Sequence, residues 1–137
     1  MSENVTTPLT SIKGPLDLTD SYKLCECCLN ILESLKTHDL VSIDVSEHSS
    51  LADFMLIGTG TSSRHVIAIA EKLIEKLKEL GARNLTLAGV ESGEWVIVDC
   101  GPVIVHLMQE MVRERYQLDD LYRCLAAGQF SELADAS

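Results

Sequence analysis

One amphipathic helix set among short strand-like segments constrains the fold of this chain more than any other feature. In residues 61–80 the apolar side chains recur every three or four positions, and the opposite face is charged. This spacing is typical of a helix that packs one side against a sheet. The hydroxyl side chains of Thr61, Ser62 and Ser63 suit its N-terminus, and Gly81 suits its C-terminus. We therefore expect this helix to cross over and cover one face of a sheet.

Segments of strand length surround this helix. Residues 41–46 alternate between apolar and polar side chains, as in a strand with one face in water. Residues 53–57 are apolar on both faces after Asp53, which predicts a central strand that Gly58 ends. After the helix, two glycine-containing turns separate three further segments, and the last two of these are expected to form a hairpin. The three segments are residues 84–90, 94–99 and 103–108.

Helical spacing recurs near both ends of the chain. With the strands, it predicts an α/β (α+β) fold, in which a mixed sheet of about five strands has flanking helices. We expect a single domain at residues 17–125, between a disordered leader at residues 1–16 and a flexible tail at residues 126–137. The additional helices are predicted at residues 17–37, 110–116 and 118–124.

The composition restricts where the protein can be located and which partners it can bind. The net charge is −10, from 21 acidic and 11 basic residues, which disfavours nonspecific binding to nucleic acid and to anionic membranes. The apolar runs are far shorter than the roughly 20 residues of a membrane helix, and the polar N-terminus lacks the features of a signal peptide. We therefore expect a cytoplasmic protein with little or no direct nucleic-acid binding. Any action near RNA would pass through a basic protein.

The single tryptophan, Trp95, lies in a part of the sequence whose charged residues are all acidic. Its neighbours are Glu91, Glu94 and Asp99, and no lysine or arginine occurs in residues 84–112. Tryptophan is strongly enriched in interface hot spots, and surrounding carboxylates favour a basic protein surface. A lone tryptophan in a small domain is also commonly a core residue, and this alternative stays open. Against it, Trp95 directly follows a turn, and strand alternation places the carboxylate of Asp99 on its face.

No catalytic or metal-binding motif is complete. The glycines at 58 and 60 precede a helix, but the lysine of a P-loop and the three-glycine dinucleotide pattern are missing. The run Ser-Ser-Arg-His at residues 62–65 matches no hydrolase motif. The strand-associated carboxylates lack the Asp-x-Asp spacing that would place two of them on one strand face. We expect no catalytic residue, no cofactor and no metal. The carboxylates in question are Asp44, Asp53 and Asp99.

The five cysteines do not indicate a disulfide framework or a metal site. An odd number in a cytosolic chain argues against the former. The cluster Cys25-x-Cys27-Cys28 lies in a helical pattern without a second Cys/His pair at ligand spacing. Cys28 falls on the apolar stripe of this helix, so we expect buried thiols.

Three stretches of the chain resemble a known family. They are GTGTSSRHV at residues 58–66, GVE with EWVIVD at residues 89–99, and VIVHLMQE at residues 103–110. In order and spacing they are similar to the ribosomal silencing factor family, RsfS, also called Iojap-like. The similarity extends over residues 24–123. One departure is Tyr122, where several relatives carry tryptophan.

The resemblance implies a fold like that of nucleotidyltransferases without the catalytic residues, and a translational repressor rather than an enzyme. It implies binding to the large ribosomal subunit through large-subunit ribosomal protein fourteen, at the subunit interface. The bound factor then blocks association with the small subunit and lowers protein synthesis under nutrient limitation. Self-association as a homodimer is implied as well.

The expected partner-binding residues are selected for different reasons. Trp95 matches the tryptophan that the family uses against its ribosomal partner. Glu91, Glu94 and Asp99 follow from the charge around it, and Met108 and Gly89 from their position beside the hairpin.

Two alternatives remain open. One is a metal-dependent nucleotidyltransferase-like enzyme that uses Asp44, Asp53 or Asp99 with the glycine loop. The other is a scaffold that dimerises through the edge of its sheet.

Overall fold

The computed structural model describes residues 20–47, 49–117, 120 and 123–124. The predicted leader, the predicted tail and most of the helix predicted at residues 118–124 lie outside the described residues. The elements, in chain order, are α1 (Ser21–Ser34), β1 (His38–Asp44), β2 (Phe54–Thr59), α2 (Ser63–Glu79), β3 (Thr86–Ala88), β4 (Trp95–Asp99), β5 (Val103–Met108) and α3 (Glu110–Tyr116).

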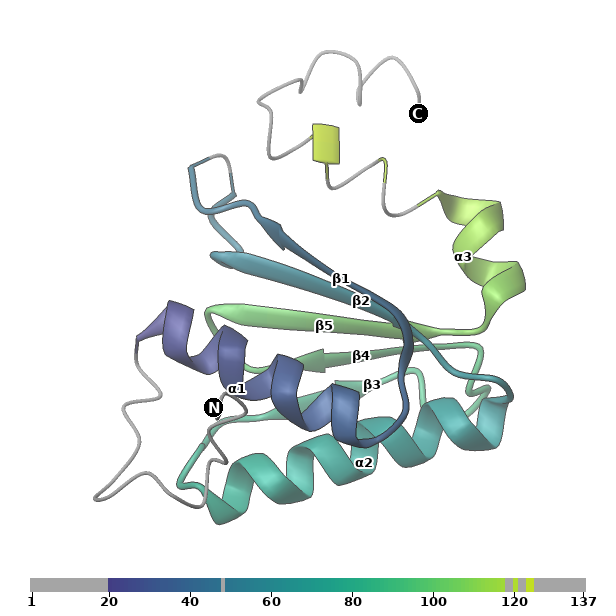
Figure 1. The fold of residues 1–137 in the computed structure, drawn as a ribbon, viewed down its shortest axis with the longest axis horizontal. Coiled ribbons are helices and arrows are strands. Elements are labelled where there is room, and N and C mark those ends of the chain that lie inside the picture. The colour runs from purple at the N-terminus through teal and green to yellow at the C-terminus, as the bar shows by residue number, and fades with distance from the viewer. Residues whose placement is uncertain (1–19, 48, 118–119, 121–122, 125–137) are drawn as a thin grey trace, which may run out of the picture.

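The strands form one mixed sheet in the order β1-β2-β5-β4-β3 (Figure 1). β2 and β5 pair in parallel, and the other neighbouring strands pair antiparallel. The parallel pair is possible because α2 and the strands β3 and β4 intervene in the chain. The prediction of an α+β fold with a five-stranded mixed sheet is confirmed.

α1 and α2 cover one face of this sheet. Their apolar residues share a buried cluster with side chains of β2, β4 and β5. Both helices have side-chain caps at their N-termini. At α1, the carboxylate of Asp20 accepts from the backbone N–H groups of Tyr22 and Lys23. At α2, the hydroxyl of Ser62 accepts from the backbone N–H of His65. The predicted crossover helix is thereby confirmed as a cover for the sheet.

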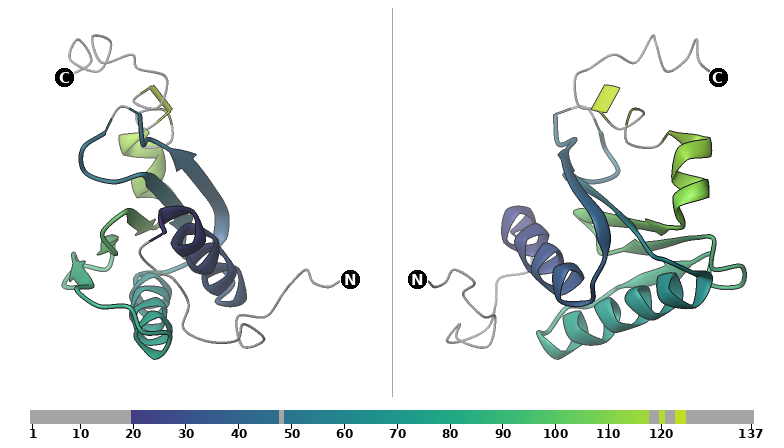
Figure 2. Two further views of the ribbon diagram at one scale, coloured as in Figure 1. Left: turned by 90° about the vertical axis from the view of Figure 1, so that its left-hand side faces the viewer. Right: turned by 45° about the vertical axis from the view of Figure 1, so that its right-hand side comes forward.

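The other face of the sheet carries a second, smaller cluster. In the right-hand view of Figure 2 the strands pass between α1 and α3. α3 contributes Val112 to this cluster, and Trp95 packs against its margin. Alternation along the strands explains the division, because successive side chains point to opposite faces. The buried members are Ile43, Val45, Ala52, Met55, Ile57, Met108 and Val112.

Several strand boundaries differ from the predictions. β1 covers His38–Asp44 rather than residues 41–46. β2 does not end at Gly58 but continues to Thr59, because Gly58 pairs with Leu107 of the parallel strand β5. The glycine is needed there for space, since a Cβ atom would collide with the methyl group of Thr37. β3 covers three residues of the predicted seven. It is followed by Gly89, whose φ of 87° turns the chain away from the sheet.

Candidate functional site

Trp95 is the first residue of β4 and is partly buried. Its indole Nε1–H donates a hydrogen bond to Nδ1 of His106 over 3.1 Å. The ring centroids of Trp95 and His106 are 6.0 Å apart, and those of Trp95 and Tyr116 are 5.2 Å apart. The tryptophan is therefore neither sealed in the core nor free in solvent, but held between a strand histidine and a helix tyrosine.

The sheet register produces this contact. In the β4–β5 pair, Trp95 faces Met108 and Ile97 faces His106. Trp95 and His106 are thus diagonal neighbours on one face, within reach of a large aromatic side chain. The position of the histidine follows from strand pairing and is not visible from its distance in the sequence.

His106 is 4 % exposed. Its burial lowers the pKa of the imidazole from 6.5 to about 4, because the charged form loses its hydration. The ring is therefore neutral near pH 7. A neutral imidazole offers one acceptor nitrogen, and the geometry assigns that role to Nδ1.

α3 adds exposed side chains beside Trp95 and His106. The side chain of Tyr116, which contacts Trp95, is 52 % exposed, and that of Met111 is 67 % exposed. Val112 and Tyr116 are four residues apart and share a helix side, so the buried valine anchors the helix beside the tryptophan. Sequence reasoning did not select Tyr116. The i,i+4 spacing from Val112 is the signal that could have indicated it.

The turn before β4 carries two of the expected carboxylates. Glu91 and Glu94 are both exposed. Gly89 supports this turn, since its carbonyl accepts from the N–H of Gly93 over 3.2 Å. Gln109 joins the turn to the start of α3, because its backbone N–H donates to the carbonyl of Glu94 over 3.1 Å.

Two of the expected site residues lie elsewhere. Met108 is 0 % exposed and belongs to the cluster beneath α3. It packs under Trp95 and cannot touch a partner in this structure, so its assignment to the contact surface is corrected. Asp99 ends β4, about 13 Å along the strand from Trp95 at ~3.3 Å per residue. Its carboxylate accepts from the N–H of Gly101 over 2.8 Å and shapes the β4–β5 turn.

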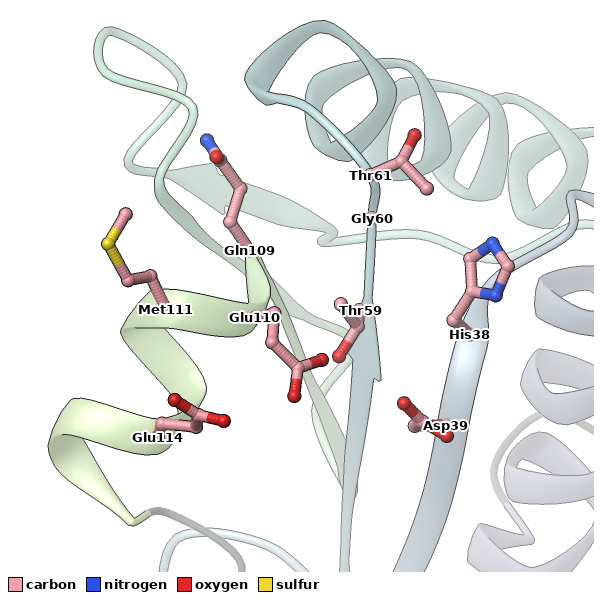
Figure 3. A pocket seen from close by; sticks show the side chains of 9 residues that line it. All are labelled: His38, Asp39, Thr59, Gly60, Thr61, Gln109, Glu110, Met111 and Glu114. Atoms are coloured by element: carbon pink, nitrogen blue, oxygen red, sulfur yellow. The ribbon is translucent and has the colours of Figure 1, made fainter.

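An acidic groove of about 550 Å³ lies on the other side of α3 (Figure 3). It is bounded by the beginning of β1, the end of β2 and α3. Figure 3 shows that Asp39 lines the groove from β1 and that Glu110 and Glu114 line it from α3. Arg113 donates from Nη1 to the Thr59 hydroxyl over 2.8 Å and so fastens α3 to β2 beside the groove. The groove was not predicted, because Asp39 is remote from α3 in the sequence.

Two of the residues considered for catalysis, Asp44 and His65, make local hydrogen bonds. The carboxylate of Asp44 accepts from the backbone and hydroxyl of Ser46, which lowers the pKa of Asp44. His65 accepts the Thr61 backbone N–H at Nδ1 over 2.9 Å, so the histidine stabilises the turn before α2. Among the described residues, no three His, Cys, Asp or Glu side chains are grouped to hold a metal ion.

The cysteines of α1 are buried as expected. Cys25, Cys27 and Cys28 join Cys100 in the core beneath the helices. Burial raises the pKa of the Cys27 thiol to about 11. The pKa values of the Cys25 and Cys28 thiols are raised as well, so the three thiols of α1 remain protonated near neutral pH and contribute to packing.

The described helices include none that is both long enough and apolar enough to cross a bilayer.

The fold defines a class of small α+β proteins with a five-stranded mixed sheet, and solved structures share it. A crystal structure of a protein from Chromobacterium violaceum matches with a TM-score of 0.72 at 38 % identity, covering 75 % of this chain and 86 % of that one. A crystal structure from Bacillus halodurans matches with a TM-score of 0.66 at 31 % identity, covering 74 % of this chain and 94 % of that one.

The sequence comparisons name the family. The family described as "Ribosomal silencing factor during starvation" matches residues 19–136. Ribosomal silencing factor RsfS of Haemophilus influenzae is 43 % identical over 99 residues, which cover 72 % of this chain and 97 % of that protein. The chain belongs to the ribosomal silencing factor family and is a ribosome-associated regulator of translation. The resemblance seen in the sequence motifs is thereby confirmed.

Proposed function

We propose that this protein represses translation by binding the large ribosomal subunit and blocking its association with the small subunit. Family membership supports the ribosomal target and the regulatory role. The blocking step needs no chemistry, because a folded domain bound at the subunit interface excludes the other subunit by its volume. Large-subunit ribosomal protein fourteen, the partner implied by the motif resemblance, is the proposed docking point.

The observation that carries the proposal is the partly buried Trp95 beside the exposed ring of Tyr116. Interface hot spots are enriched in tryptophan and tyrosine, which lie in well-packed pockets near the centre of the interface. Here the indole donates a hydrogen bond to His106 and packs against Tyr116, so part of its conformational freedom is already lost before binding.

The charges around this pair define the chemistry of the partner. Glu91 and Glu94 flank Trp95 from the turn, and the carboxylates of the acidic groove lie on the other side of α3. A basic protein surface complements both groups. RNA phosphates would be repelled by the same carboxylates, which is why we assign the contact to a ribosomal protein.

Replacing Trp95 tests this surface. We expect Trp95→Ala to weaken binding to isolated large subunits by about 2–4 kcal/mol, as for an aromatic hot spot. Tyr22→Ala is the matched control, because Tyr22 is 60 % exposed and lies on α1, on the helix-covered side of the sheet. Pull-down of large subunits with each folded variant decides the matter. Equal capture by both variants would refute the proposed surface.

The proposal contains no catalytic step, and this too is testable. The rival enzyme would require a nucleotide and a divalent metal near Asp44, Asp53 or Asp99. Titration with Mg²⁺ and nucleotide should give no saturable binding. Saturable binding that is lost in Asp44→Asn would favour the enzyme instead.

Self-association belongs to the same proposal. In the described sheet, β1 and β3 are the edge strands, and an unpaired edge can take up a strand of a second copy. Sedimentation of the free protein at increasing concentration tests for this dimer, and a constant monomeric mass would exclude it.

A further inference from the structure

We propose that His106 is the positioning residue of the binding surface, and that its Nδ1 atom holds the Trp95 indole in the orientation that the ribosomal partner meets. This inference rests on the proposed function, because it assigns the presented face of Trp95 to that partner. His106 itself is buried and does not touch the partner.

The first support is the geometry of the pair. The hydrogen bond from the indole to Nδ1 of His106 measures 3.1 Å, which is an ordinary length for a nitrogen donor. The two rings are inclined by 50° with centroids 6.0 Å apart, so they do not stack. The polar edge of the indole is thus turned inward, toward the buried histidine. Rotation of the indole would break this bond.

The second support is the position of Trp95 in its strand. Trp95 begins β4 directly after a turn, and the chain before it bends at Gly93 with a φ of 71°. The packing contacts of Trp95 with Met108 and Tyr116 are non-directional, so they do not by themselves determine which edge of the indole faces inward. A partly buried indole N–H also requires an acceptor. His106 satisfies the donor and selects the rotamer with one bond.

The third support is the protonation state of His106. Since burial lowers the pKa of His106 to about 4, the imidazole is neutral near pH 7. The lone pair of Nδ1 is then available, and the ring proton resides on Nε2. A protonated ring would present N–H groups at both nitrogens and could not accept from the indole.

Two substitutions separate hydrogen bonding from packing. In His106→Asn the side-chain oxygen can occupy nearly the place of Nδ1, so an acceptor is kept. In His106→Leu the side chain has similar volume and branching but no acceptor. If His106 acts by packing alone, the leucine variant should perform at least as well as the asparagine variant.

Fluorescence reports the site directly, because Trp95 is the single tryptophan of the chain. We expect His106→Leu to shift the emission to longer wavelength and to raise quenching by acrylamide, because the freed indole N–H turns toward water. We expect His106→Asn to remain close to wild type. Circular dichroism identifies folded variants. An unchanged spectrum in folded His106→Leu would overturn the proposal.

The wild-type protein provides a test that needs no variant. The ¹⁵N shifts of the two His106 ring nitrogens report which one carries the proton at pH 7. The proposal requires the proton on Nε2 and slow solvent exchange of the Trp95 indole proton. A proton on Nδ1 would overturn it.

Binding to isolated large subunits completes the test. We expect His106→Leu to bind about tenfold more weakly, as when one ordering hydrogen bond is lost, and His106→Asn to recover most of the affinity. If Trp95→Ala binds normally while the fluorescence of His106→Leu is shifted, the contact surface is wrong and the orienting bond stands. If Trp95→Ala binds weakly but His106→Leu binds like wild type, the positioning role is refuted and the surface stands.

Discussion

The backbone of Gly89 approaches the carbonyl oxygen of Trp95 so closely that no side chain fits between them. Gly89 also has a φ of 87°, which only glycine adopts without strain. The turn that carries Glu91 and Glu94 is thereby packed against the start of β4. This explains why a glycine stands beside the proposed binding surface.

Gly89→Ala should therefore destabilise the protein. We expect a loss of about 3 kcal/mol in the free energy of unfolding, from backbone strain together with the collision at Trp95. Gly101→Ala is the control, because Gly101 has a φ of 88° but no atom within 4 Å of the added carbon. Its loss should be about 1 kcal/mol, the cost of strain alone. Urea unfolding measures both values, and equal losses would show that the collision is unimportant.

The burial of His106 predicts a dependence of stability on pH. The folded pKa is about 4 and the unfolded value 6.5, so the unfolded chain binds more protons between these values. The contribution of His106 is fully present above pH 6.5 and falls as the pH decreases toward 4. The full difference is about 3 kcal/mol, at 1.36 kcal/mol per pKa unit. Urea unfolding at a series of pH values should show this loss relative to His106→Asn. Parallel curves for the two proteins would contradict the prediction.

The acidic groove should govern the rate of association. Reversing Glu110 and Glu114 to lysine should lower the association rate constant by about tenfold at low salt, because long-range attraction acts mainly on encounter. The double variant Glu71→Lys with Glu79→Lys makes the same change in net charge on the exposed face of α2. Stopped-flow mixing with large subunits compares them. The same rate for both double variants would mean that the groove has no specific part in docking.

Thr37 offers a test of polar burial in the fold. Its hydroxyl is buried without a hydrogen-bond partner among the described residues, and its methyl group fills the space beside Gly58. Thr37→Val keeps the methyl and removes the unpaired hydroxyl, so it should stabilise the protein by about 1 kcal/mol. Thr37→Ser keeps the hydroxyl and removes the methyl, and should destabilise it. Thermal unfolding gives the order, and a less stable valine variant would contradict the account.

Local patterns in the sequence predicted those elements whose ends are determined locally. α3 begins and ends where its apolar spacing indicated, at Glu110 and Tyr116. β2 extends beyond its predicted end because Gly58 and Thr59 pair with β5. No local sequence pattern reveals this pairing.

The arrangement of residues at the candidate site could be predicted only in part for the same reason. Trp95 followed from its residue type and its turn. Met108 was assigned to the surface, but it is buried because α3 folds over it, and Asp99 was grouped with Trp95 although an extended strand separates them. His106, Tyr116 and the acidic groove arise from strand register and from the docking of α3, so they required the three-dimensional structure.

Sedimentation of separated ribosomal subunits with this protein tests the central claim most directly. We predict that the wild-type chain travels with the large subunit and that fewer joined ribosomes form when small subunits are added. Trp95→Ala, folded but lacking the indole, should remain at the top of the gradient and leave joining intact. Joined ribosomes that form equally well with and without the wild-type protein would contradict the account.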